Sequence, residues 1–329
     1  MRIILDAMGS DNHPQPEIQA AVQAAKEFRC EILLVGDENQ LADKLAQANP
    51  QNAAVRIVHA PEVFEMTTKL SGSMLRKVQN SMGVCMDLLK SGEGDVVVTA
   101  GNTGGAMAIG LARLGRLKGV KRPALSALFP VRGGHCVVLD LGANTDCRPE
   151  YLVQFAQMGS VYARQMLKID RPRVGLVSNG EEAGKGNDLV KATYPLLQAT
   201  GLNFIGNIEG KELFGGEADV AVADGFTGNV LLKASEAVAK FMTDILKEEL
   251  MATARTKVGA LLAKPAFDTL KRTLDPDEVG GVPLLGINGL VFVGHGRSDA
   301  RALVNGMRWA KQAVEGDLLG ALRAVMEGK

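Results

Sequence analysis

Residues Asp219–Lys233 read DVAVADGFTGNVLLK and contain a short apolar strand, two glycines and the start of a helix. The strand, Asp219–Ala223, lacks the polar alternation of a half-exposed strand, which predicts that both faces of its sheet are covered. Gly225 and Gly228 predict a tight turn after the strand. A strand, a glycine-containing turn and a helix in this order form the repeating unit of doubly wound α/β folds.

The helix after this turn is expected to begin near Val230, with Thr227 or Asn229 as its cap. Backbone N–H groups at the start of a helix have no partner inside the helix, and they bind anions. The turn is therefore a candidate anion site. Its candidate residues are Asp224, Gly225, Thr227, Gly228 and Asn229.

The same junction occurs three more times in the chain. Apolar strands at Ile3–Leu5, Asp95–Ala100 and Cys136–Asp140 each lead into a polar loop that contains glycine. Ligands of open α/β sheets lie beyond the carboxyl ends of the strands, so neighbouring strands would bring these loops to one cleft. Further candidates for that cleft are Gly101, Asn102, Thr103 and Gly104 after the second strand, and Gly142 and Asn144 after the third.

Length and composition predict a soluble cytoplasmic protein with one domain over residues 1–329. Lysines with arginines and aspartates with glutamates both number 37, so no overall charge attracts nucleic acid. The four cysteines lack metal-type spacing, and the apolar run near the N-terminus is too short for a signal peptide. We expect a three-layer α/β/α fold with a mostly parallel sheet, no metal and no cofactor.

Two further loops add a cation and a histidine. Lys185 lies between glycines after the strand Arg173–Ser178, and it is either a phosphate ligand or an ordinary surface residue. The loop is not a P-loop, because no G-x-x-x-x-G-K-[ST] motif is present. His295 follows the strand Gly289–Gly294 and is expected on the same loop face, with Ser298 as the cap of the last helix.

Two segments carry clustered basic residues. Arg113–Arg122 contains no acid, so it is either a solvated face or a docking site for an acidic protein or a phosphate-bearing ligand. Met251–Leu274 is a helical excursion with Val258, Leu261 and Leu262 on one side. It predicts a core or homodimer helix, or a basic amphipathic tip that rests on an anionic bilayer. The cations of the first segment are Arg113, Arg116, Lys118, Lys121 and Arg122.

Motifs of covalent and nucleotide-dependent enzymes are absent from the sequence. We find no G-x-S-x-G, no HExxH and no paired-carboxylate signature, and G-x-G-x-x-G does not follow the first strand. Cys147 lies near the expected cleft but is not expected to be a nucleophile. Pro61–Ser81 is polar and weakly periodic, which is typical of a lid or cleft wall.

Six motifs occur in order over almost the whole chain. They are DAMGSD at 6–11, GNTGGAM at 101–107, LDLGAN at 139–144, GNIEG at 206–210, DGFTGNVLLK at 224–233 and PLLGINGLVFVGHG at 283–296. Together they resemble the bacterial phosphate acyltransferases of phospholipid synthesis. Two positions depart from that pattern: Ser10 stands where the family commonly has glycine, and Asn179 stands where isoleucine is expected.

The resemblance implies a fold similar to isopropylmalate dehydrogenases and phosphotransacetylases. It also implies that an acyl group passes from acyl carrier protein to inorganic phosphate, and that the acyl phosphate then goes to a membrane-embedded glycerol-3-phosphate acyltransferase. Phosphate is the nucleophile, so no covalent residue is required. For this reaction Lys185 is a candidate phosphate ligand and His295 a candidate acid for the leaving thiolate. The candidate oxyanion donors are Asn102, Asn144 and Asn229.

Three other functions remain possible at this point. A coenzyme A-dependent phosphotransacetylase would use the same anion site together with a nucleotide pocket. A dehydrogenase is disfavoured, because no aspartate cluster for a metal stands beside an arginine-rich acid site. A non-catalytic phosphate-binding scaffold for lipid enzymes would need only the anion site.

Overall fold

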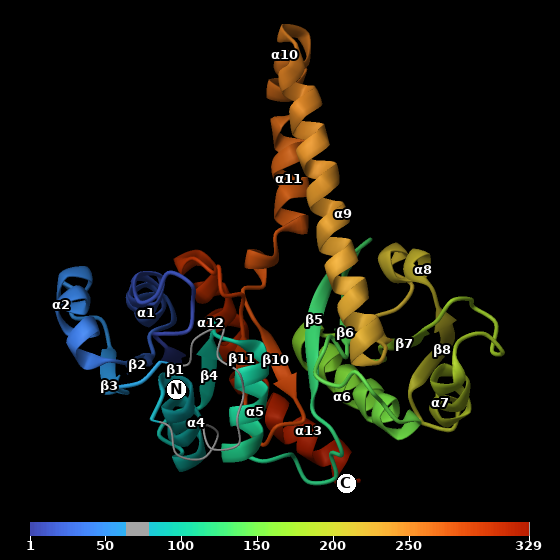
Figure 1. Ribbon diagram of the computed structural model, residues 1–329, viewed down its shortest axis with the longest axis horizontal. Coiled ribbons are helices and arrows are strands. Elements are labelled where there is room, and N and C mark those ends of the chain that lie inside the picture. The colour runs from blue at the N-terminus through green and yellow to red at the C-terminus, as the bar shows by residue number, and fades with distance from the viewer. Residues whose placement is uncertain (64–78, 329) are drawn as a thin grey trace.

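The computed structural model describes residues 1–63 and 79–328 (Figure 1). Most of the expected lid at Pro61–Ser81 lies outside these residues. The described strands form one eleven-stranded sheet in the order β3-β2-β1-β4-β11-β10-β5-β6-β9-β7-β8. Their bounds are β1 Arg2–Asp6, β2 Glu31–Gly36, β3 Val55–His59, β4 Val96–Thr99, β5 Ala124–Val131, β6 Gly134–Leu139, β7 Arg173–Val177, β8 Asn203–Ile208, β9 Val220–Val222, β10 Val282–Leu285 and β11 Val291–Val293.

Strand direction reverses in the middle of the sheet. β10 is antiparallel to β11 and to β5, and β5 is antiparallel to β6. The other neighbouring strands pair in parallel. The sheet is mostly parallel as expected, but β6, β9 and β7 run opposite to β1, β4 and β11. The carboxyl ends of its two halves therefore lie at opposite ends of the strands.

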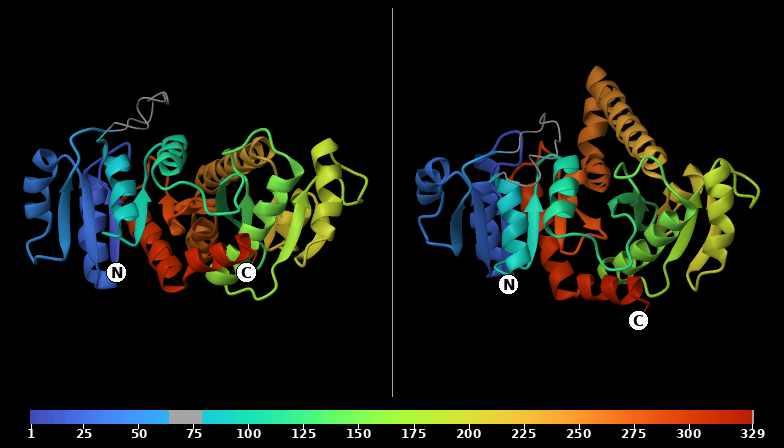
Figure 2. Two further views of the ribbon diagram at one scale, coloured as in Figure 1. Left: turned by 90° about the horizontal axis from the view of Figure 1, so that it is seen from below. Right: turned by 60° about the horizontal axis from the view of Figure 1, so that its bottom comes forward.

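Helices cover both faces of the sheet and give the expected three layers (Figure 2). One face packs against α1, α6, α12 and α13, and their core includes Ile18, Phe155 and Leu303. The other face packs against α4 and α5 in the first half, and against α8 and the start of α9 in the second. The helices are α1 Gln15–Phe28, α2 Glu38–Ala48, α4 Ser81–Ser91, α5 Thr103–Arg113, α6 Pro149–Leu167, α7 Asp188–Gln198, α8 Gly210–Gly215, α9 Gly225–Ala252, α10 Ala254–Leu262, α11 Lys264–Leu274, α12 Ala300–Glu315 and α13 Leu318–Met326.

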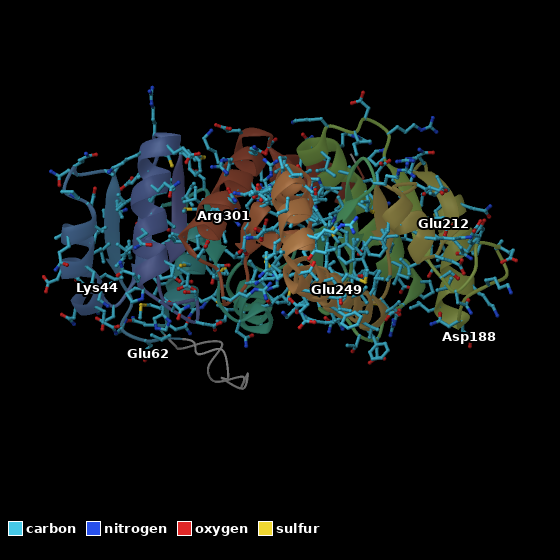
Figure 3. The ribbon with its side chains drawn as sticks, turned by 90° about the horizontal axis from the view of Figure 1, so that it is seen from above. Lys44, Glu62, Asp188, Glu212, Glu249 and Arg301 are labelled. Atoms are coloured by element: carbon cyan, nitrogen blue, oxygen red, sulfur yellow. The ribbon has the colours of Figure 1, made fainter. Side chains whose placement is uncertain are left out.

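Helices α9, α10 and α11 form an arm that projects far from the sheet (Figure 1). Seen from above, Glu249 of the arm stands between Arg301 on α12 and Glu212 on α8 (Figure 3). Arg301 holds the returning end of the arm, because its guanidinium lies 2.5 Å from the Asp275 carboxylate. The excursion expected at Met251–Leu274 is thus only the outer part of a longer structure that begins in α9.

The start of α9 differs from the expectation. The helix begins at Gly225 rather than near Val230, and its cap is Asp224 rather than Thr227 or Asn229. The Asp224 carboxylate accepts hydrogen bonds from the N–H of Thr227 at 2.9 Å and from its hydroxyl at 2.7 Å. Aspartate caps a helix as well as asparagine does, and it here precedes both predicted caps.

Side-chain oxygens also cap two other helices beside the site, and the cap of α12 differs from the sequence expectation. Asn102 caps α5, and its Oδ1 accepts a hydrogen bond from Gly105 N at 2.8 Å. Asp299, not Ser298, caps α12 and accepts a hydrogen bond from Ala302 N at 2.9 Å. Asparagine and aspartate oxygens thus set the starts of the helices that follow β4 and β11.

Candidate active site

The loops after β1, β4 and β11 lie together at one end of the sheet. Thr99 of β4 pairs with Val293 of β11, so the loops that contain Asn102 and His295 leave neighbouring strands at the same level. The β1–α1 loop packs beside them, since a Cβ on Gly9 would lie only 2.8 Å from the backbone nitrogen of Gly101. The first turn of α5, with its backbone N–H groups, opens at this end.

A pocket of about 220 Å³ lies between these loops and α9. The N–H of Asp11 donates to the carbonyl oxygen of Gly296 at 2.7 Å and joins two of its walls. Within the described residues, Arg297 makes no hydrogen bond or ion pair, whereas Lys233 pairs with Glu236 at 3.0 Å. Arg297 is therefore the cation that the pocket offers to an anion directly, and Lys233 becomes a second one when it leaves Glu236. Its lining residues are Asp11, Lys233, Glu236, His295, Gly296 and Arg297.

His295 stands in this pocket as a mainly neutral ring. Desolvation lowers its pKa below the ordinary value for histidine, and Arg297 and Lys233 act in the same direction against the opposing effect of Glu236. A proton donor for a leaving thiolate must be protonated first. The role of general acid is thus disfavoured for His295 at neutral pH, and a neutral hydrogen-bonding role is favoured.

Asp140 organises the loops at the other end of the sheet. It follows β6 directly and is fully buried. Its carboxylate accepts four hydrogen bonds: from Leu125 N at 2.9 Å, from Ala143 N at 3.2 Å, and from the backbone and side-chain nitrogens of Asn144 at 2.7 and 2.9 Å. The pKa of Asp140 lies above its ordinary value, because the effect of burial exceeds the lowering by these hydrogen bonds. The four donors stabilise the ionised form and fix the loop.

Asn144 has no side-chain hydrogen left for a substrate. Its Nδ2 donates to the Asp140 carboxylate and, at 2.8 Å, to the carbonyl oxygen of Pro123. An amide nitrogen carries two hydrogens, and both are used. Its backbone oxygen accepts a hydrogen bond from Gly225 N at 2.8 Å. Asn144 therefore joins the loops after β6 and β9 and does not serve as the expected oxyanion donor.

The glycines at the start of α9 permit close approach to the β6 loop. A Cβ on Gly228 would lie 1.9 Å from the Asp140 carbonyl oxygen, and one on Gly225 would lie 2.7 Å from the Asn144 carbonyl oxygen. Both are helical, so the tight turn expected there is wrong. The exposed Asn229 side chain lies beside Gly142 and makes no hydrogen bond within the described residues.

Helix α9 connects the two ends of the site. The single cleft expected from the sequence is wrong, because the reversal at β10 separates the loops after β4 and β11 from those after β6 and β9. However, Asn229, Lys233 and Glu236 are spaced by four and three residues, which places them on one face of α9. The last two line the pocket beside His295. This spacing is visible in the sequence and could have revealed Lys233 and Glu236 as site residues.

Lys185 lies in the loop after β7, next to the start of α9. Leu176 of β7 pairs with Val222 of β9, so these two loops are neighbours. The Lys185 side chain is exposed, and its backbone N–H donates to Glu182 O at 2.9 Å. The geometry is compatible with a phosphate ligand and with a surface lysine.

Acidic side chains partly neutralise the basic segment Arg113–Arg122. Arg113 pairs with Asp87 at 3.0 Å, and Lys121 lies 3.6 Å from Glu150. These acids come from other parts of the chain, so the local sequence could not show them. The cations that remain more exposed are Arg116, Lys118 and Arg122.

Cys147 is unsuited to nucleophilic chemistry, as expected. Burial raises the pKa of its thiol to about 11, and its sulfur lies 3.3 Å from the Asn144 carbonyl oxygen. The reactive form of a cysteine is the thiolate, which this environment disfavours. The described site thus provides hydrogen bond donors and cations for a substrate anion.

Residues 1–319 match the family model described as "Fatty acid synthesis protein". The chain belongs to this family. The phosphate acyltransferase of Pelotomaculum thermopropionicum is 47% identical over 327 residues, which cover 99% of this chain and 95% of that protein. The phosphate acyltransferase of Geobacter sulfurreducens is 44% identical over 327 residues, covering 99% and 94%. The chain is accordingly an acyltransferase.

Solved structures with similar folds include two phosphotransacetylases. The EutD phosphotransacetylase from Staphylococcus aureus has a TM-score of 0.60 at 15% identity, covering 96% of this chain and 94% of that one. A phosphotransacetylase from Streptococcus pyogenes has a TM-score of 0.62 at 14% identity, with the same coverage. At these identities the likeness extends to the fold, which is the fold expected from the sequence.

Proposed function

We propose that the acyltransferase moves a fatty acyl group from acyl carrier protein to inorganic phosphate and releases acyl phosphate for phospholipid synthesis. The observation that carries this proposal is the match over nearly the full chain to proteins named phosphate acyltransferase. The pocket with Lys233 and Arg297 supports it, because these cations suit a phosphate dianion.

In this reaction a phosphate oxygen attacks the thioester carbonyl, the C–S bond breaks, and the carrier thiolate leaves. Lys233 and Arg297 hold the phosphate, helped by the first-turn N–H groups of Thr103 and Gly104. Asn229 and Asn102 are the candidate donors to the developing oxyanion. A thiol with a pKa near ~8.5 departs without a strong acid, which fits a neutral His295.

A hydroxylamine trap tests the function directly. Purified protein, phosphate and acyl carrier protein charged with a fatty acid should give an acyl hydroxamate that depends on phosphate. Equal turnover with acyl-coenzyme A would favour a phosphotransacetylase. An absence of product with either donor would favour a phosphate-binding scaffold.

Lys185→Ala should raise the phosphate concentration needed for half-maximal rate or lower turnover, with the fold intact. The reason is the position of this lysine beside the start of α9, where a cation attracts the dianion. Phosphate saturation curves with the two proteins measure the effect. Lys191→Ala on the neighbouring helix serves as the control. An unchanged phosphate saturation curve for Lys185→Ala would show that Lys185 is an ordinary surface residue and no phosphate ligand.

The segment Arg113–Arg122 is the proposed docking site for acidic acyl carrier protein. It adjoins the site, because the carbonyl oxygen of Pro123 accepts a hydrogen bond from Asn144. Charge reversal at Arg116 and Lys118 should raise the KM for the carrier substrate several-fold and leave the phosphate KM unchanged, since docking is electrostatic. The difference should shrink in high salt. Equal changes in both constants would indicate general damage.

We propose that the arm packs against a second copy of the chain in a homodimer. Within the described residues, α10 and α11 contain no buried residue, and α9 buries only Gly225 and Gly228. A helix this exposed gains little from packing, so a homodimer would supply the missing contacts. The exposed apolar side chains of α9 include Phe226, Val230, Val238, Phe241, Met242 and Ile245.

The outer end of the arm is the proposed contact with an anionic membrane surface. Val258, Leu261 and Leu262 of α10 are strongly exposed. The described part of the chain contains no helix with the length and apolarity needed to span a bilayer. Attachment would be peripheral and would place the protein near the glycerol-3-phosphate acyltransferase that uses its product.

Val258→Asp with Leu261→Asp should release the protein from anionic liposomes. Two charges at the tip remove the apolar contact, while the nearby basic residues contribute only about 1 kcal/mol each. Co-sedimentation with vesicles measures binding, and light scattering measures the dimer. Activity on soluble substrate should persist. Loss of the dimer with unchanged vesicle binding would instead make these residues part of the interface.

A further inference from the structure

Glu17 lies in the first turn of α1 and is fully buried beneath the β1–α1 loop. Its Oε1 accepts a hydrogen bond from the N–H of Ser10 at 3.1 Å. Its other oxygen and the Ser10 hydroxyl are both buried and have no hydrogen bond partner. The Ser10 side chain lies beside the carboxyl group, so a small rotation would pair the two.

Glu17 holds the β1–α1 loop, and this loop contacts the loops that follow β4 and β11 at the same end of the sheet. Asp11 N donates to Gly296 O at 2.7 Å, next to His295 and Arg297. Gly9 packs against the backbone at Gly101, just before the start of α5. A shift of this loop would therefore displace one wall of the pocket.

The surroundings of Glu17 favour its neutral form. Asp140 accepts four hydrogen bonds, whereas Glu17 accepts one from a backbone N–H within the described residues. The pKa of Glu17 is raised to about 7: burial raises it most, hydrogen bonding by Ser10 and by the Glu17 backbone lowers it, and the nearby buried Asp6 contributes a smaller rise. A buried carboxylate with so few donors is costly, so the group keeps its proton below about pH 7, well above the range in which an exposed glutamate ionises.

Other charged groups on the elements that pack near Glu17 do not offset the rise in its pKa. His13 of the same loop is occupied with the carbonyl oxygen of Ser10 at 2.7 Å. On α12, Arg308 pairs with Glu27, and Arg301 pairs with two acids near the arm, Asp275 and Glu278. Asp299 caps α12, where its side chain accepts a hydrogen bond from Ala302 N.

We propose that Glu17 is a positioning residue for acyl transfer: its neutral carboxyl group donates a hydrogen bond to Ser10 Oγ while its other oxygen accepts the Ser10 N–H, which locks the wall of the pocket. The inference rests on the proposed function. Glu17 touches no substrate and acts through Asp11 and Gly296.

The sign of the pH effect follows from the raised pKa. The unfolded chain loses this proton near the ordinary value for glutamate, 4.5, and the folded chain near about 7. Between these values the folded state binds more protons, so stability falls as pH rises, and the full loss is reached above about 7. Activity follows the ionisation of Glu17 in the folded chain, so it should decline as the pH rises through about 7. His295 titrates on the acid side of 6.5 and does not produce it.

The test compares Glu17→Gln, Glu17→Ala and the wild type from about pH 4 to about pH 9. Glutamine keeps both hydrogen bonds and carries no charge, so Glu17→Gln should match wild-type activity at low pH and lose the decline in activity through about pH 7. Its urea stability should fall less with rising pH than that of the wild type, and the remaining fall belongs to Asp6 and Asp140, whose pKa values burial also raises. Glu17→Ala should raise the phosphate KM roughly tenfold while far-UV circular dichroism stays unchanged.

Two outcomes would overturn the inference. Glu17→Gln could show the wild-type pH dependence, or Glu17→Ala could bind phosphate as the wild type does. A wild type that forms no acyl phosphate would instead contradict the proposed function. In that case the urea stability of wild type and Glu17→Gln against pH still decides whether Glu17 is neutral, because unfolding requires no substrate.

Discussion

Gly228→Ala should destabilise the protein by about 3 kcal/mol and abolish acyl transfer. The new Cβ would lie 1.9 Å from the carbonyl oxygen of Asp140. The backbone at Asp140 is fixed, because its N–H donates to the carbonyl oxygen of Ala223 and its side chain accepts a hydrogen bond from the N–H of Asn144. Neither the start of α9 nor the loop after β6 can shift at low energetic cost, so α9 must move away from the β6 loop. Asn229 and Lys233 would move with it, and the site would lose its shape.

Urea unfolding and the hydroxylamine assay measure the two effects. Gly259→Ala is the matched control, because Gly259 is also helical and a Cβ there meets no atom within 4 Å. That substitution should stabilise its helix by about 0.5 to 1 kcal/mol. Similar stability for the two variants would show that α9 and the β6 loop do not approach closely.

Asn229→Ala should lower kcat about a hundredfold, the usual cost of losing one oxyanion donor. The residue is exposed, does not cap α9, and lies on the helix face that reaches the pocket. Its removal should therefore leave the free energy of unfolding unchanged. Steady-state rates at saturating phosphate measure the loss.

Two further variants sharpen this prediction. Asn229→Asp keeps the shape but replaces the donor by an acceptor, so it should be at least as impaired as alanine. Lys240 lies on the same face of α9, nearer the outer end of the arm, so Lys240→Ala should retain full activity. An Asn229→Ala enzyme with wild-type kcat would remove this residue from the reaction and leave Asn102 as the candidate oxyanion donor.

The sheet could be predicted from the sequence to a large extent, because its parallel strands are uninterrupted apolar runs. The reversal could not. β10 covers Val282–Leu285 and follows two glycines, and it includes a proline, which is the local pattern of a loop. Its direction is set by pairing with β11 and β5, and such pairing leaves no trace in a short segment.

The candidate site was predictable where local rules decide it. Turn glycines and polar residues after the strands marked the loops that the structure places at the two ends of the sheet, although the helices that follow are capped by Asp224 and Asp299 instead of the expected residues. The buried hydrogen bonds of Asp140 and Asn144 depend on residues far along the chain, such as Leu125 and Pro123. Local sequence patterns do not show these distant partners, so they led to the prediction that Asn144 is an oxyanion donor.

The length of α9 sets the height at which the reaction takes place. The helix has 28 residues, and a rise of 1.5 Å per residue gives about 42 Å between its two ends. One end carries Asn229 and the other leads directly into α10. Asn229 stands 23 residues before Ala252, the last residue of α9, which is about 35 Å. If α10 rests on lipid and α9 stands upright, the proposed reaction takes place about that far above the headgroups, which is close to the thickness of the hydrocarbon core of a bilayer. A carrier protein could then reach the site from open water, without contact with the membrane surface.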